Sequence, residues 1–120
     1  MVVFADPACC ACLELFPHLR RWQETLSSRL TIVLISNDGA DRSRVLCEKY
    51  GISNVLLQTD FAVLDAYRMP ATPSAVIVDR NGTVASDTAT GYHMIHALVR
   101  LALQRTASRP EPWELSTQPA

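Results

Sequence analysis

Two apolar runs separated by a helical stretch constrain the fold of this chain more than any other feature of its sequence. Residues 1–5 and 31–35 are short and apolar, and the second run has the β-branched character of a strand buried on both faces. Between them, residues 9–28 place apolar side chains at three- and four-residue spacing, which predicts a helix with one buried face. A strand, a helix and a strand in this order pair in parallel through a right-handed crossover. Pro17 predicts a kink in the helix, because it has no N–H to bond the carbonyl oxygen of Leu13.

A second helix is expected over residues 41–50. Its apolar side chains Val45, Leu46 and Tyr50 are predicted to face inward, and Gly51 is placed to end it.

The rest of the chain predicts smaller elements that complete the same sheet. These are a strand over residues 55–58, one or two helical turns over 61–67, a strand over 74–78, a strand over 83–88, and a last helix from 92 to about 105. Asn81 and Gly82 favour a hairpin turn between the last two strands, which would make them antiparallel. The sequence therefore predicts an α/β fold, with a mixed central sheet between two layers of helices.

The chain has 120 residues, which is enough for one domain. We place this domain at residues 1–105 and interpret residues 106–120, which lack periodicity, as a tail or linker. The net charge of −1 gives no electrostatic basis for binding nucleic acid, and no apolar run reaches the roughly 18 residues of a spanning helix. Because the chain begins inside a strand pattern without a secretion signal, we expect it to be part of a longer protein, with any membrane anchor outside it. We expect the domain to be a monomer.

The cysteines are the clearest functional signal. Cys9, Cys10 and Cys12 fall within four residues at the expected junction of strand and helix, and Cys47 is separate. Bridges in small secreted domains spread along the chain, so this clustering indicates chemistry rather than a disulfide framework. Cys9 and Cys12 have C-x-x-C spacing, with Cys9 at the helix N-terminus, where free N–H groups favour a thiolate, and Cys12 one turn inside. This arrangement predicts a dithiol redox centre.

A metal site is the alternative reading of the same residues. Zinc or copper would need further ligands beyond the cysteine cluster, and the sequence offers His18, Cys47, His93 and His96. We interpret Cys47 as a core residue. We interpret His93 and His96 as residues at the surface edge of the last helix.

Two stretches resemble the thioredoxin-like family. The first runs from Pro7 to Pro17 and reads PACCACLELFP, and the second runs from Thr72 to Gly82 and reads TPSAVIVDRNG. The expected order of elements agrees over residues 1–105, and the segment around residues 55–67 is most similar to the TlpA or redoxin branch.

The resemblance implies a fold, an activity and a site. It implies a thiol-disulfide oxidoreductase of bacterial, extracytoplasmic type that exchanges disulfides with protein partners and needs no organic cofactor, since the cysteine pair carries two electrons. It implies that Cys9 and Cys12 are catalytic and that Pro73 is cis and abuts them. Thr72, Pro73 and Ala8 would then contact the substrate.

The chain departs from the family pattern around the cysteines. Ala8 stands where the family commonly has tryptophan, and Val3 stands where thioredoxin proper has a buried acid. Cys10 replaces the usual glycine or proline and, with Asp6 three residues before Cys9, is a candidate modulator of the site. We expect Cys9 to be the acidic thiol, Cys12 to be buried with a higher pKa, and Cys10 to face the surface. A peroxiredoxin-type peroxidase shares the expected fold and remains an alternative.

Overall fold

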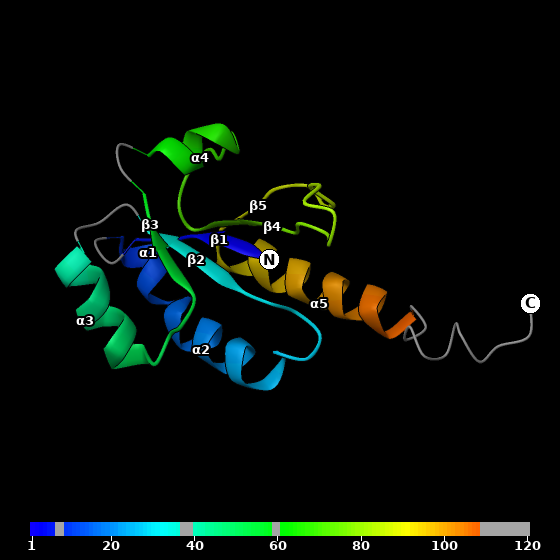
Figure 1. Ribbon diagram of the computed structural model, residues 1–120, viewed down its shortest axis with the longest axis horizontal. Coiled ribbons are helices and arrows are strands. Elements are labelled where there is room, and N and C mark those ends of the chain that lie inside the picture. The colour runs from blue at the N-terminus through cyan, green and yellow to red at the C-terminus, as the bar shows by residue number, and fades with distance from the viewer. Residues whose placement is uncertain (7–8, 37–39, 59–60, 109–120) are drawn as a thin grey trace, which may run out of the picture.

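The first strand, β1 (Val2–Phe4), lies at the centre of a sheet whose strands run in the order β3-β2-β1-β4-β5. We describe a computed structural model of the chain at residues 1–6, 9–36, 40–58 and 61–108 (Figure 1). Strands β2 (Val33–Ser36) and β3 (Val55–Leu57) run parallel to β1, with Val2 opposite Val33. Strand β4 (Ser74–Val76) runs antiparallel on the other side of β1, and β5 (Ala89–Thr90) is antiparallel to β4. The mixed sheet predicted from the sequence is confirmed.

The helices cover both faces of this sheet. They are α1 (Cys10–Leu13), α2 (Phe16–Thr25), α3 (Ala40–Tyr50), α4 (Ala62–Ala66) and α5 (Tyr92–Ser108). Because successive strand residues point to opposite faces, Val3 enters one core and Phe4 enters another. The larger core receives side chains from α1, α2, α3 and α5, whereas α4 packs against the smaller core on the opposite side (Figure 1). The three-layer arrangement is therefore confirmed.

The helical stretch after β1 is two helices rather than one kinked helix. The chain turns at Glu14 and Leu15, and the Leu15 carbonyl oxygen then accepts the first bonds of α2 from His18 and Leu19, both at 3.0 Å. Pro17 lies in the first turn of α2, where a missing N–H leaves no helical bond unmade. Proline thus starts the second helix instead of bending a single one.

The expectation for α3 is correct in its extent and partly wrong in its face. Tyr50 packs against Phe16, with ring centroids 5.6 Å apart, and Gly51 follows the helix at φ +69° as its cap. Val45, however, is 59% exposed and faces outward. The side chain of Leu46 lies outside the described residues.

The hairpin after β4 forms its predicted turn but not its predicted strand over residues 83–88. The turn is closed by the N–H of Asp79 donating to the Thr83 carbonyl oxygen at 2.9 Å. Beyond a single bridge between Val78 and Val84, the chain regains the sheet only at β5. The Ser86 hydroxyl accepts the N–H of Ile77 at 2.9 Å, so a side chain takes the place of a backbone bond in the ladder. The backbone pairing with β4 therefore resumes only at β5, near residue 90, and not over residues 83–88.

The last helix, α5, continues to Ser108, beyond the boundary expected near residue 105, and residues 109–120 lie outside the described part of the chain. Among the described residues, no helix has the length and apolar character needed to cross a bilayer.

Candidate active site

The cysteine cluster lies where the carboxyl end of β1 meets α1. Cys9 precedes the first residue of α1 in an extended conformation, and its carbonyl oxygen accepts the N–H groups of Cys12 and Leu13, both at 3.1 Å. Its own N–H donates to the Asp6 carbonyl oxygen at 3.1 Å. Cys9 is therefore the N-cap of α1, as the spacing predicted, and the helix starts at the cysteine itself.

The three clustered thiols differ in their exposure to solvent. Cys9 is partly exposed, Cys10 is exposed as the first residue of α1, and Cys12 is fully buried in the larger core. All three, like Cys47, are free thiols. This order agrees with the expectation from the sequence.

The segment around Pro73 forms the other side of the site and faces Cys9. The Thr72–Pro73 peptide bond is cis, as expected, and Pro73 is buried. The Cys9 thiol donates to the Thr72 carbonyl oxygen, with the sulfur 3.8 Å from the oxygen. The Pro73 carbonyl oxygen accepts the N–H of Gly91 at 2.9 Å, which ties this segment to the end of β5. The fold thus brings together two motifs that are 63 residues apart in the sequence.

The surroundings separate the acidities of the two thiols. Partial burial raises the pKa of Cys9, but hydrogen bonds from the side chain and backbone of Cys12 outweigh it and hold the pKa below its ordinary value. The Thr72 side chain adds to this lowering. Burial raises the pKa of Cys12 to about 12, and its hydrogen bond to Cys9 acts in the same direction. The arrangement favours a thiolate on Cys9 and a protonated thiol on Cys12.

Asp6 has a structural connection that sequence reasoning missed. One of its carboxylate oxygens accepts the Ser36 hydroxyl at 3.2 Å, and the Ser36 hydroxyl also lies 3.1 Å from the Ser43 hydroxyl. Ser36 and Ser43 are buried polar residues, so their hydroxyls hold the Asp6 carboxylate against β2 and α3. Only the serine that ends an otherwise apolar strand could have indicated this role.

Cys10, a predicted modulator, and Ala8, a predicted contact for the substrate, add little to the description of the site. Cys10 shows only its exposed position beside Cys9. Ala8 lies outside the described residues.

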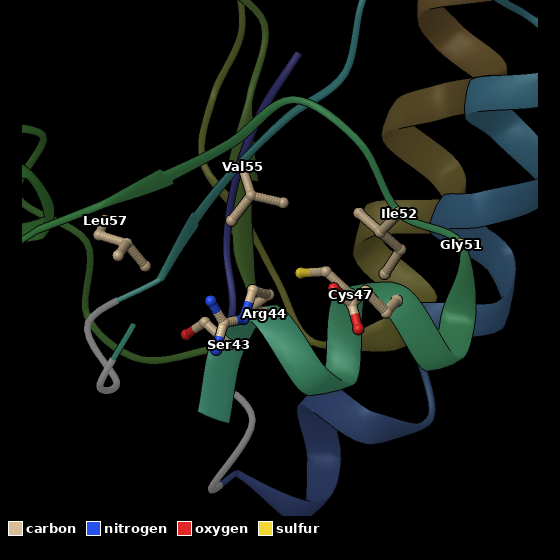
Figure 2. A pocket seen from close by; sticks show the side chains of 8 residues that line it. Ser43, Arg44, Cys47, Gly51, Ile52, Val55 and Leu57 are labelled. Carbon is tan, nitrogen blue, oxygen red and sulfur yellow. The ribbon is translucent and has the colours of Figure 1, made fainter. Parts of the chain in front are cut away.

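The additional ligands considered for a metal are not gathered around the cysteines. In the described part of the chain, no group of three or more His, Cys, Asp or Glu side chains could hold a metal ion. Cys47 is only partly buried and faces a pocket of about 420 Å³ between α3 and β3, beside Ile52 and Val55 (Figure 2). Burial raises the pKa of its thiol, so it has the character of a packing residue more than of a reactive one.

The histidines of α5 do not both lie at a surface edge. His93 is exposed, but His96 packs between α5 and α2 against His18 and Trp22. The spacing of Tyr92 and His96, four residues apart on one helix, could have indicated a shared face.

No family model matches this chain, and no curated protein matches it. Solved structures do. A putative thiol:disulfide interchange protein DsbE from Chlorobium tepidum matches with a TM-score of 0.76 over 88% of this chain and 77% of its own, at 16% identity. A secreted Mycobacterium tuberculosis disulfide oxidoreductase matches with a TM-score of 0.66 over 85% and 78%, at 20% identity. The exposed lipoprotein thioredoxin Etrx1 from Streptococcus pneumoniae matches with a TM-score of 0.66 over 86% and 82%, at 15% identity.

These matches define the class of the fold. The chain has a thioredoxin-like fold, as the two sequence motifs indicated. The solved structures that share it include thiol-disulfide oxidoreductases, among them a putative DsbE and a secreted homologue of DsbE.

Proposed function

We propose that the chain is a thiol-disulfide oxidoreductase that exchanges disulfides with protein partners through Cys9 and Cys12. The observation that carries the proposal is the contact of the Cys9 sulfur with the Thr72 carbonyl oxygen, which sets a partly exposed thiol beside the cis-proline segment. The buried Cys12 stands one turn inside the same helix. The redox neighbours support the same assignment.

The reaction follows from the different acidities of the two thiols. The Cys9 thiolate attacks one sulfur of a partner disulfide, which forms a mixed disulfide and releases the other partner sulfur as a thiolate. Cys12 then gives up its proton and attacks Cys9, so that the partner leaves with two thiols and Cys9 and Cys12 form a disulfide. The partner gains two electrons, and its two sulfurs become thiols by taking the Cys12 proton and one proton from water. The reverse sequence oxidises a dithiol, and no organic cofactor takes part in either direction.

The partner approaches the exposed side of Cys9. In this proposal Thr72, Pro73 and Ala8 contact the substrate chain, while Cys10 and Asp6 modulate the site. We place the activity outside the cytoplasm, because the neighbours with the same fold include a secreted protein and an exposed lipoprotein.

Trapping a mixed disulfide tests the assignment. Cys12→Ser should accumulate a covalent complex with a disulfide-bearing protein on Cys9, located by peptide mass spectrometry, because resolution by Cys12 is lost. Cys9→Ser should form none. Cys10→Ala should retain most of the turnover, and Cys47→Ala is the matched control for loss of a thiol outside the site. Trapping mainly on Cys10, or equal loss of turnover in Cys10→Ala and Cys9→Ala, would contradict the proposal.

A further inference from the structure

His18 and His96 belong to one aromatic cluster between α2 and α5, and the exposed His93 lies beside Tyr92 at its edge. The His96 ring centroid lies 4.4 Å from that of Tyr92, 4.8 Å from that of His18 and 4.8 Å from that of Trp22. His18 on α2 and Tyr92 on α5 are 74 positions apart in the sequence and are joined within this cluster. Imidazole is the side chain that ordinarily changes its charge near neutral pH.

The contact of His18 with Arg21 fixes which ring nitrogen faces Tyr92 as a donor. The Arg21 guanidinium donates to Nδ1 of His18, with the two nitrogens 3.3 Å apart. A neutral ring that accepts at Nδ1 carries its proton on Nε2, and this nitrogen lies 3.0 Å from the Tyr92 hydroxyl. A second proton on the ring would set two N–H donors face to face at Nδ1. The bond between Nε2 of His18 and the Tyr92 hydroxyl does not depend on that second proton, so acid acts on the contact between α2 and α5 through His96.

His96 has no compensation for a positive charge. Its Nε2 atom is buried without a hydrogen-bond partner among the described residues. The titratable and charged groups that face it are His18 and Arg21 on α2 and Tyr92, His93 and Arg100 on α5, with no carboxylate among them. Burial, and then repulsion by these neighbours, lowers the pKa of His96. The closed packing therefore favours the neutral ring of His96, whereas the protonated ring favours a state in which water reaches it.

The cluster connects the two segments that form the candidate active site. Tyr92 directly follows Gly91, whose N–H donates to the Pro73 carbonyl oxygen at 2.9 Å. His18 lies in the first turn of α2, immediately after the helix that carries Cys12. A change in the contact between α2 and α5 therefore changes how the cis-proline segment sits against the cysteines.

We propose that His18, Tyr92 and His96 form an acid-sensitive latch that holds α2 against α5 and opens when His96 is protonated, freeing Cys9 from its contact with Thr72. This histidine latch gives the site a regulation by pH, and its role in turnover rests on the proposed function. The latch itself is a property of packing and can be measured without any disulfide-bearing partner.

The test is the rate at which iodoacetamide alkylates Cys9 in the reduced full chain, divided by the thiolate fraction, between pH 5 and pH 7.5. In the wild type this corrected rate should rise several-fold toward pH 5. For each pKa unit by which the closed packing lowers the pKa of His96, protonation shifts the equilibrium between the closed and the open latch about tenfold toward the open state. His96→Phe keeps a ring but cannot titrate, so its corrected rate should stay flat. His93→Gln removes an exposed histidine from the same helix, and because His96 keeps its titratable ring, the rise toward pH 5 should remain.

A second variant tests the latch even where the phenylalanine of His96→Phe disturbs the packing between α2 and α5. Tyr92→Phe removes one hydroxyl and leaves the rings in place, so the corrected rate at pH 7.5 should already approach the wild-type value at pH 5. A flat wild-type profile, or a Tyr92→Phe profile equal to that of the wild type, would overturn the latch. Failure of disulfide exchange with normal alkylation profiles would instead overturn the proposed function and leave the latch standing.

Discussion

At the scale of the residue, the chemistry of the site depends on what surrounds each of two identical thiols. Cys9 is partly exposed and receives hydrogen bonds, whereas Cys12 is buried under it and donates one of those bonds. The same S–H···S contact therefore lowers the pKa of one thiol and raises that of the other.

This pairing can be tested by changing only the donor at position 12. Cys12→Ser keeps a hydroxyl that can donate to Cys9, whereas Cys12→Ala removes the donor. The Cys9 pKa should stay below its ordinary value in Cys12→Ser and rise in Cys12→Ala, because a thiolate without its donor is less stable. The measurement is the pH dependence of iodoacetamide alkylation, with Cys10→Ala in both backgrounds so that one thiol at the helix end reacts. Equal Cys9 pKa values in the two variants would contradict the role of the contact.

At the scale of the element, the sequence predicted what depends on local pattern and missed what depends on distant partners. The parallel strands follow from the order of apolar runs and helical pattern along residues 1–35, and α3 follows from its own pattern and cap. The cis Thr72–Pro73 bond follows from the resemblance of its motif to a known family. The late start of β5 was not predictable, because it depends on the Ser86 hydroxyl bonding the backbone of Ile77. The outward Val45 was missed for a related reason, since an apolar residue on a short helix carries no mark of which face the sheet will cover.

The candidate site divides in the same way. Its cysteines and proline were readable from the sequence, because they recur in a recognisable motif. The contacts of Asp6 with Ser36 and of His96 with His18 join residues that share no local pattern, and only the packing of helices and strands brings them together.

The end of α3 offers a test of how an element is held in place. Gly51 has φ +69°, and a Cβ atom added there would lie 3.1 Å from Nε of Arg20. Gly51→Ala should lower the free energy of unfolding by roughly 1–2 kcal/mol, because a non-glycine residue is strained in the left-handed region. Gly51→Asn should lose less, since asparagine tolerates that conformation better. Urea denaturation of the three proteins measures the difference, and an unchanged midpoint in Gly51→Ala would show that the cap does not limit stability.

At the scale of the whole molecule, the sheet is protected unequally at its two sides. Strand β5 is followed at once by α5, but β3 is the last strand on its side among the described residues. Its residues Leu56 and Leu57 are 58% and 50% exposed, and Leu57 lines the pocket of Figure 2.

That open strand has a consequence for the behaviour of the purified protein in concentrated solution. An unpaired apolar edge is a template on which further chains can add, and a net charge of −1 provides little repulsion to keep molecules apart. Leu56→Lys sets a charge on the edge without touching the cysteines, so turbidity on concentration should develop later than in the wild type, whereas Leu101→Lys on α5 should give a smaller delay. Equal delays would mean that net charge alone governs precipitation. A larger effect at position 56 would identify β3 as the place where aggregation starts, and would make one lysine the simplest route to a sample that survives storage.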